Sequence, residues 1–347
     1  MNSLERVVAA LNHKEADRVP VYPLLNGISR RLTNVNYKTW ATDAEKCAEA
    51  FIAVTNKYDL DIICTLTDLS VEAADFGQKI IFPENEAAHP DYDNILIKEE
   101  EDYYNVKYIN PRVSPRMSEH IKLCKILMDT VGSEKPVVAF LFAPLGILSM
   151  LRNQQNIFLD LYDCPKAVHC ALEEITNTLI EYCDALIETG VHAIMFDTLF
   201  ACQGILGKEM WKEFEGVYMK KIADFVHKKG CMVMIHNCGK GIYFDAQIES
   251  MSPEAISFLH IPDDCSSWEE VKEKYGSKTT LIGCVDPTWI HSASPEEVES
   301  KCREQIDLFA KDGGFILATG CEYPANSEFK NAEVMVETAK TYGKYQN

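Results

Sequence analysis

Long apolar runs are missing from this chain of 347 residues, since none approaches the roughly 20 residues that a helix needs to cross a bilayer. Positive charge is also scarce, with 34 lysines and arginines against 53 aspartates and glutamates and a formal net charge of −19. A surface this acidic repels phosphate backbones and anionic lipids, so we expect neither a nucleic-acid nor a membrane partner. Hydrophobic residues make up 47% of the chain and charged residues 25%, a balance that excludes extensive disorder and is typical of a globular enzyme.

Export and anchoring signals are absent as well. The first residues, MNSLERVVAALNHKEADR, carry charges inside their apolar pattern, and the final KYQN contains neither a prenylation box nor a retention signal. We therefore expect a cytoplasmic protein whose 13 cysteines are mostly reduced thiols. The majority lie in apolar or helical contexts, where a thiol serves as a small hydrophobic group, but Cys238 and Cys321 do not.

No Gly-rich phosphate turn follows any of the predicted strands, which disfavours an open doubly wound sheet. Instead, eight continuous apolar runs of the kind found in buried parallel strands alternate with longer helical patterns. The predicted strands are residues 19–25, 61–68, 136–143, 193–199, 231–237, 255–261, 279–285 and 315–320. The clearest predicted helices are residues 43–58, 165–188, 208–229, 295–311 and 332–342. This alternation predicts an α/β fold of the TIM, or (β/α)₈, barrel type.

One stretch, residues 78–111, interrupts the alternation after the second predicted strand and is expected to be a β-hairpin or small meander. Its acidic run, Lys98–Asp102, is interpreted as a solvated face. Because no low-complexity linker and no repeat of short period divides the chain, we expect residues 1–347 to form a single barrel domain with this insertion.

The strongest chemical signal is His236-Asn237-Cys238, at the end of the fifth predicted strand. In an extended segment, the spacing of two places both ligand-type side chains on the same face. Cys321 directly follows the last predicted strand, and in a barrel all strand ends of this kind open on one face. The three side chains can therefore converge as a zinc site with one open position, which is typical of catalytic zinc.

A histidine and two thiolates would leave bound Zn²⁺ roughly neutral. Such a centre can lower the pKa of a substrate thiol from about 8.5 while leaving the thiolate nucleophilic. This chemistry suits alkyl transfer to sulfur better than hydrolysis of a carbonyl. The alternative to a metal site is that the H-x-C pattern occurs by chance in a chain with many cysteines.

Several stretches resemble the uroporphyrinogen decarboxylase superfamily, over nearly the whole chain. They are Asp17-Arg18-Val19-Pro20-Val21, Val71-Glu72-Ala73-Ala74-Asp75-Phe76-Gly77, Ala143-Pro144-Leu145-Gly146, Met234-Ile235-His236-Asn237-Cys238-Gly239 and Leu281-Ile282-Gly283-Cys284-Val285-Asp286-Pro287. Within that superfamily the chain looks like the branch of corrinoid-dependent methyltransferases, which includes methylcobamide:coenzyme M methyltransferases and related bacterial demethylating enzymes. The mark of that branch is a zinc motif of H-x-C and a distant C, matched here by His236, Cys238 and Cys321.

The resemblance implies a TIM barrel, a zinc ion and a corrinoid carried by a separate protein that docks on the barrel mouth. A stretch that is similar to a cobalt-ligating loop, Asp224–Gly230, has one residue too many and is interpreted as the end of a helix. The implied reaction moves a methyl group between cobalt and a small molecule. We favour transfer from methyl-cobalt to a thiol, and leave open the demethylation of a methoxy compound onto Co(I).

Two other functions are open to a chain of this sequence. Uroporphyrinogen decarboxylase clamps a polycarboxylate with an arginine-rich segment after its first strand, and here that segment retains Arg30 and Arg31 without the usual motif. The acidic chain is a poor host for a polycarboxylate, and the three zinc ligands would have no role in that enzyme. A non-catalytic zinc barrel that only holds a corrinoid partner is the third hypothesis.

Further polar side chains near the predicted strand ends are candidate site residues. Asp197 is a catalytic candidate that orients a neighbouring group, although a helix-capping role is equally consistent with its position. A capping role for Asp68, and a turn role for Asp286 before Pro287, compete in the same way with substrate contact. His260 is also a reserve metal ligand. The candidates for substrate binding are Tyr22, Asn26, Asp68, Glu72, His260, Asp286 and Tyr323.

Overall fold

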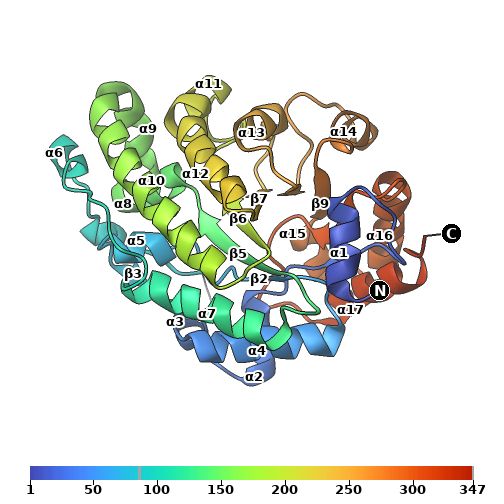
Figure 1. Ribbon diagram of the computed structural model, residues 1–347. Helices are drawn as coiled ribbons and strands as arrows, with labels where there is room; N and C mark the ends of the chain where they lie inside the picture. The colour runs from blue at the N-terminus through green and yellow to red at the C-terminus, as the bar shows by residue number, and fades with distance from the viewer. Residues whose placement is uncertain (85–86, 346–347) are drawn as a thin grey trace.

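The computed structural model describes residues 1–84 and 87–345. Its main sheet has eight parallel strands in the order β1-β10-β9-β8-β7-β6-β5-β2, curled with helices outside it (Figure 1). The strands are β1 Val21–Tyr22, β2 Ile63–Cys64, β5 Val137–Phe142, β6 Ala193–Asp197, β7 Met232–Asn237, β8 Ala255–Phe258, β9 Thr280–Val285 and β10 Phe315–Thr319. Each lies inside one of the eight predicted segments, so the predicted barrel-type fold is confirmed and the doubly wound alternative is wrong.

Helices follow the strands in turn and pack outside the sheet (Figure 1). They are α1 Ser3–Leu11, α2 Arg30–Thr33, α3 Tyr37–Thr42, α4 Ala44–Tyr58, α5 Val71–Asp75, α6 Glu100–Tyr103, α7 Pro115–Val131, α8 Pro144–Arg152, α9 Gln154–Asp163, α10 Pro165–Glu188, α11 Lys208–Trp211, α12 Val217–Lys228, α13 Phe244–Met251, α14 Trp268–Tyr275, α15 Pro287–Ser292, α16 Pro295–Phe309 and α17 Lys330–Thr341. A π-helical turn over Lys212–Gly216 joins α11 to α12. Across the described residues, no helix combines the length and apolar character required to cross a membrane.

Burial on both faces explains why the strand sequences are continuously apolar rather than alternating. One set of strand residues, including Val138, Met195 and Met234, packs in a cluster inside the curled sheet. The alternate residues, including Val137 and Ile235, belong to the larger cluster beneath the outer helices. Successive residues of a strand therefore point to the interior and to the helix layer in turn.

Asp61 joins the first and last strands of this order. Its backbone N–H donates to Val21 O at 3.1 Å, and its fully buried carboxylate accepts the Val21 N–H at 2.8 Å. The same carboxylate pairs with Arg18 at 2.7 Å and Arg6 at 2.8 Å. Two guanidinium groups thus neutralise the buried charge that links β1 to the segment entering β2.

Helix α1 covers the end of the sheet at which the strands begin. Val7, Ala10 and Leu11 pack into the interior cluster, and Thr280, the first residue of β9, donates its hydroxyl to Ala10 O at 3.1 Å. The opposite end, where the strands finish, is left for the loops that carry the candidate site residues.

The insertion after β2 differs in part from the prediction. An antiparallel pair forms between β3 (Ile80–Ile81) and β4 (His89–Pro90), so a hairpin is present, but each strand has only two residues. Residues 85–86 lie outside the described part of the chain. Beyond β4 the chain forms a 3₁₀ turn at Tyr92–Asn94 and then α6, rather than further strands. The acidic run favours α6 because Asp102 accepts the N–H groups of Lys98 and Glu99, which caps the helix.

Candidate metal centre and cavity

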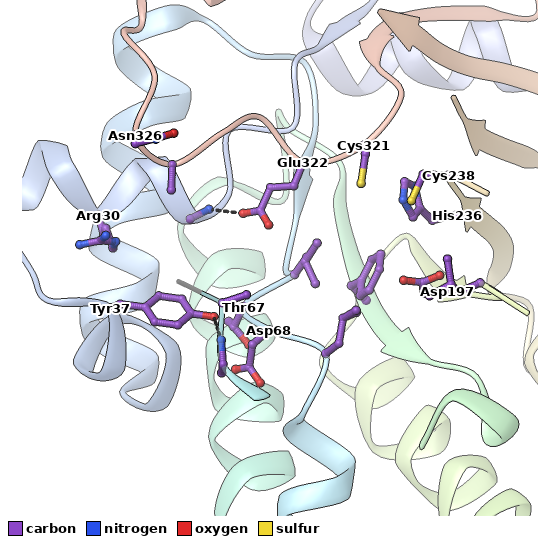
Figure 2. Close-up of a pocket in the computed structure, with 18 of the residues that line it drawn as sticks. Arg30, Tyr37, Thr67, Asp68, Asp197, His236, Cys238, Cys321, Glu322 and Asn326 are labelled. Atoms are coloured by element: carbon purple, nitrogen blue, oxygen red, sulfur yellow. Dashed lines mark hydrogen bonds between the residues drawn. The ribbon is translucent and has the colours of Figure 1, made fainter. Parts of the chain in front are cut away.

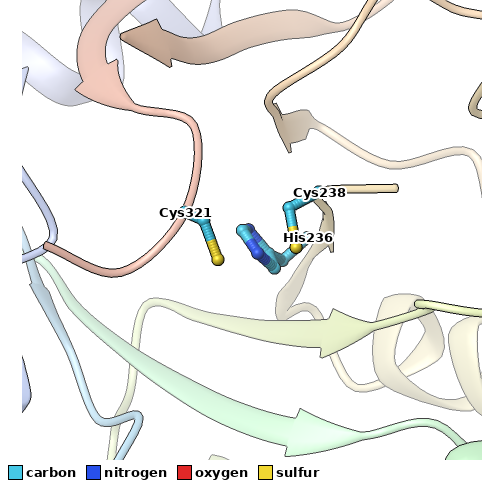
Figure 3. A group of neighbouring side chains, drawn as sticks. All are labelled: His236, Cys238 and Cys321. Carbon is cyan, nitrogen blue, oxygen red and sulfur yellow. The ribbon is translucent and has the colours of Figure 1, made fainter. Parts of the chain in front are cut away.

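His236, Cys238 and Cys321 converge at the carboxyl ends of the strands, as the sequence predicts (Figure 3). Each offers one ligand atom, and the three atoms all lie within 4.8 Å of one another. His236 is 4% exposed, whereas the two cysteines are partly accessible. Nitrogen and sulfur donors in this number and proximity fit a tetrahedral zinc ion with one remaining position.

Strand alternation and two glycines place the three ligands. His236 and Cys238 continue the inward-pointing series that begins with Met232 and Met234 in β7. Gly239 follows at once, and a Cβ there would lie 2.4 Å from Cys202 Sγ, so only glycine fits this turn. Gly320 precedes Cys321 where the chain passes the backbone of Leu259, and its Cβ would lie 2.6 Å from Leu259 Cα.

The orientation of the His236 ring is set by Ser257 in β8, the residue that faces it in the strand register. The Ser257 hydroxyl lies 3.0 Å from His236 Nδ1 and is buried. With Nδ1 engaged in this bond, Nε2 is the nitrogen left to bind a metal. A hydrogen bond to the second ring nitrogen is the usual support of a histidine ligand.

The surroundings of the three ligands favour a bound cation. The neighbouring Cys238 and burial raise the pKa of the Cys321 thiol. Asp197, which pairs with His236 in the register of β6 and β7, is 5% exposed and has one carboxylate oxygen, Oδ1, without a hydrogen-bond partner in the described structure. Burial raises the pKa of Asp197 to about 6.

Because α11 begins only at Lys208, the alternative that Asp197 caps the next helix is wrong.

A cavity of about 780 Å³ opens above these ligands (Figure 2). The ligands and Asp197 lie at one end of it, and Arg30, Tyr37 and Asn326 lie at the other. Leu66, Leu69, Phe140, Met150 and Leu199 provide apolar lining. The arrangement gives a small molecule a metal-binding end, an apolar middle and a polar end.

Asp68 is the one predicted substrate-binding residue that lines this cavity. Its carboxylate pairs with Arg116 at 2.5 Å and accepts the Ser70 N–H at 2.9 Å. The residue that directly precedes α5 is Ser70, so Asp68 stabilises the turn before the helix rather than serving as its N-cap. Its charge is therefore largely committed to Arg116.

The other predicted substrate-binding residues do not line the cavity. Tyr22 donates its hydroxyl to Asn26 at 3.2 Å, within the buried region below it. Glu72 is 2% exposed and accepts the Phe142 N–H at 3.2 Å, so it supports the end of β5. Tyr323 is buried, and its hydroxyl donates to Glu328 O at 2.8 Å.

His260 and Asp286 lie on the loops after β8 and β9. Asp286 is the N-cap of α15, where it accepts the Thr288 and Trp289 N–H groups, so the turn role is the one observed. His260 is partly exposed and is not among the clustered ligand atoms of the described residues, so it is no fourth ligand in this structure.

Ser257 and Glu322 are site residues that the sequence interpretation missed. The Glu322 carboxylate lines the cavity and accepts the Gly27 N–H at 2.7 Å, which connects the Cys321 loop to the loop after β1 (Figure 2). Alternation along β8 would have indicated Ser257, because Ala255 points into the interior cluster and Ser257 follows it by two. Glu322 has no such signal beyond its place next to Cys321.

The stretch Asp224–Gly230 is the end of a helix, as predicted. Helix α12 stops at Lys228, and Gly230 follows with φ of +78°. His227 lies 3.3 Å from Glu254 rather than in the cavity.

Comparison with known proteins places the chain among relatives that match it over nearly its whole length. A family model described as uroporphyrinogen decarboxylase (URO-D) matches residues 2–342. A methylcobamide:CoM methyltransferase from Methanosarcina mazei is 24% identical over 351 residues, covering 97% of each chain. A uroporphyrinogen decarboxylase from Vesicomyosocius okutanii is 22% identical over 352 residues, covering 97% of this chain and 98% of that one.

Solved structures agree on the fold. A methyltransferase from Methanosarcina mazei matches with a TM-score of 0.83 at 19% identity, over 99% of each chain. A B12-independent methionine synthase from Shewanella matches with a TM-score of 0.54 at 15% identity, over 94% of this chain and 95% of that one. With the URO-D model matched over residues 2–342, this chain belongs to the uroporphyrinogen decarboxylase family.

Proposed function

We propose that this protein is a zinc-dependent methyltransferase that moves a methyl group between a small molecule and the cobalt of a corrinoid carried by a separate protein. The observation that carries the proposal is the convergence of His236, Cys238 and Cys321 within 4.8 Å at the cavity. A relative that matches over 97% of each chain is named as a methylcobamide:CoM methyltransferase, which supports a cobalt-linked methyl group as one side of the reaction. In this proposal the corrinoid partner docks over the mouth of the cavity, because the chain itself offers no cobalt-ligating loop.

The residues around the ligands have defined tasks in this proposal. Ser257 holds the His236 ring by Nδ1, and Cys238 and Cys321 approach from two different loops, so the donor atoms are arranged before a metal binds. Zinc bound there would favour the thiolate form of a thiol substrate, or polarise the oxygen of a methyl ether. The unpartnered Oδ1 of Asp197 can accept a hydrogen bond from the substrate at that end of the cavity. We favour the thiol as methyl acceptor, with demethylation of a methoxy compound as the alternative direction.

A decarboxylase function fits the cavity less well. Among its described lining residues, the basic side chains are His236, Arg30 and Arg31, and His236 belongs to the ligand group. The Arg31 guanidinium already donates to Ser327 O and lies 3.6 Å from Glu328. A substrate with many carboxylates would meet Asp68, Asp197 and Glu322 with little compensating charge.

Metal analysis tests the proposal directly. We expect about one zinc per chain in the purified protein, and loss of that zinc in Cys238→Ala and Cys321→Ala with unchanged circular dichroism. Cys170→Ala is the matched control, because Cys170 is exposed on α10 and outside the ligand group. A protein without zinc, or ligand variants that keep full zinc and activity, would exclude the proposed centre.

The direction of transfer requires a second experiment. X-ray absorption at the zinc edge should show one additional sulfur neighbour when the acceptor thiol is added, and about one proton should be released per thiol bound near neutral pH. An unchanged edge with every thiol, combined with turnover of a methoxy compound on Co(I), would instead establish demethylation.

A comparison of rates tests whether a separate corrinoid protein is the partner. Protein-bound methyl-corrinoid should react faster than free methylcobalamin at matched concentration, since docking supplies orientation. Equal rates would argue against a dedicated partner.

A further inference from the structure

Exposed apolar side chains gather on two neighbouring segments, the insertion after β2 and helix α9. Of the twelve large hydrophobic side chains that are exposed in the described residues, seven lie on these segments, which make up about an eighth of the chain. Five of them form what we call the insertion–α9 surface: Leu96, Tyr104, Tyr108, Leu159 and Tyr162. Scattered exposed apolar residues need no explanation, but tyrosines and leucines concentrated in one region are typical of a protein interface.

Polar contacts join the two segments into one surface. Tyr103, the last residue of α6, donates its hydroxyl to Asp160 of α9 at 2.7 Å. Arg152 pairs with the same carboxylate at 2.6 Å and donates to the carbonyl oxygen of Lys98, also at 2.6 Å. Four of the five surface residues lie within two residues of these contacts in the sequence, so the insertion and α9 present a continuous face.

This surface lies at the end of the barrel where the cavity opens. Figure 1 shows α6, α9 and β3 at the end of the molecule away from α1, which covers the start of the strands. The cavity wall leads directly to the surface, because Met150 lines the cavity and the carbonyl oxygen of the next residue, Leu151, accepts the Ile97 N–H at 2.9 Å. Ala88, within the insertion, lines the cavity as well. A protein seated on this surface therefore stands beside the cavity mouth.

The charge of the surface indicates the sign of its partner. Glu100 and Glu101 are exposed in the first turn of α6, and Asp163 is exposed at the end of α9. No lysine or arginine nitrogen of residues 1–84 and 87–345 lies within 4.0 Å of these three carboxylates, whereas Asp160 beneath them is paired with Arg152. Free carboxylates beside tyrosine rings suit a basic protein surface, because guanidinium and ammonium groups pair with carboxylates and also bind aromatic faces. A second copy of this chain would bring like charge to the same place.

A hollow of about 300 Å³ beside Leu96 offers an anchoring point within the surface. Its apolar walls are Phe76, Leu96, Val106 and Ile109, and Asp102 lines it as well. An arginine side chain from a partner can place its methylene stem against these walls and its guanidinium towards the carboxylate. Protein interfaces commonly depend on a few large side chains that fill pockets of this kind.

We propose that the insertion–α9 surface is the docking surface for the corrinoid-carrying protein, which meets it with a basic patch. The inference deepens the proposed function and rests on it for the identity of the partner. The unpaired carboxylates attract the partner and speed its encounter, whereas the tyrosines, the leucines and the hollow determine where it sits. The insertion, which interrupts the barrel alternation, thereby acquires a role in methyl transfer without supplying a group to the metal centre.

Binding and turnover of purified proteins test this surface. The probes are the corrinoid proteins of the source organism, each carrying methylcobalamin, and free methylcobalamin as a substrate that needs no docking. We expect Tyr104→Ser and Tyr162→Ser each to weaken calorimetric binding of the protein probe about 5- to 30-fold. The double variant Glu101→Lys/Asp163→Lys should lower kcat/KM for that probe about 10-fold at low salt, and less at about 0.5 M salt. Zinc content and the rate with free methylcobalamin should match the wild type in all of these variants.

Val8→Ser and Glu134→Lys are the matched controls. Val8 is exposed on α1, and Glu134 is exposed just before β5, so both lie at the far end of the barrel. An equal loss in the controls, unchanged binding in every surface variant, or the absence of any corrinoid protein that binds would overturn the inference. Self-association of the chain that Tyr162→Ser abolishes in sedimentation would also overturn it, because the surface would then join two copies.

Protein without zinc separates this inference from the proposed function. Binding of the corrinoid protein should persist in Cys238→Ala and should still be weakened by Tyr162→Ser, so the docking surface stands even where zinc-dependent transfer fails. Zinc binding and methyl transfer that no surface variant alters would reject the docking surface alone.

Discussion

Removal of the Ser257 hydroxyl tests how the candidate centre is organised. Ser257→Ala changes one buried atom, Oγ, which lies 3.0 Å from His236 Nδ1. The ring then loses its orienting partner, and Nδ1 remains in a site that is 4% exposed without an acceptor for its proton. Second-layer hydrogen bonds of this kind contribute 10- to 100-fold to metal affinity, so we expect zinc binding to weaken by about 1.4 to 2.7 kcal/mol.

Competition with a chromophoric chelator measures this change without reference to turnover. Ser29→Ala provides the control, since Ser29 is also buried and its hydroxyl has no hydrogen-bond partner in the described structure. The control should keep wild-type zinc affinity, whereas Ser257→Ala should release zinc at a lower chelator concentration. If both variants bind zinc as tightly as wild type, His236 is oriented by something other than Ser257 or is not a ligand.

Two further predictions concern the barrel itself. Asp61→Asn leaves Arg6 and Arg18 without their buried counter-charge, so urea unfolding should show a loss of about 3 to 5 kcal/mol. Asp17→Asn, whose partner is the same Arg6 but whose side chain is 41% exposed, should cost about 1 kcal/mol or less. Equal losses in the two variants would contradict the role of Asp61 in linking β1 to the segment that enters β2. Burial raises the pKa of Glu72 from 4.5 to about 8. Between these two pH values the folded state holds a proton that the unfolded state releases. The free energy of unfolding contributed by this group therefore falls as the pH rises from 4.5 to about 8. Glu72→Gln, whose amide oxygen can still accept the Phe142 N–H, should therefore gain stability relative to wild type from pH 5 to 8 in urea unfolding, and a constant difference across that range would refute the buried-proton argument.

The strands were predictable because burial on both faces leaves a strong mark in the sequence. Runs such as residues 136–143 and 231–237 are apolar at successive positions, and they coincide with β5 and β7. The insertion was harder, because its two-residue strands are too short to show a period. Its acidic run forms α6 through local side-chain bonds to the backbone, which hydrophobic patterning does not detect.

The ligand group was predictable for a related reason. His236 and Cys238 share a face by strand alternation, and Cys321 follows a strand that ends at the same rim. Residues in the loops obey no such alternation, so their side-chain directions cannot be predicted from spacing. Asp286, a candidate for substrate binding, is instead the N-cap of α15. Glu322 lines the cavity although nothing in its sequence context indicates this position. Glu72 was misplaced because a helix position after β2 reveals neither the depth nor the direction of the side chain.

Stability and chemistry occupy opposite ends of this molecule, and that separation makes the proposals testable. The Asp61 ion pairs and the packing of α1 lie where the strands begin, whereas the three ligands and the cavity lie beyond the strand ends. Asp197 is the last residue of β6, and His236 is the last but one of β7. Cys238 and Cys321 lie past their strands, so replacing a thiol removes few core contacts. Loss of zinc in a variant that unfolds like wild type can then be assigned to the site. The same separation explains how members of one family can keep a barrel while differing in the groups at its mouth: the strand ends and loops that supply those groups contribute little to the interior cluster.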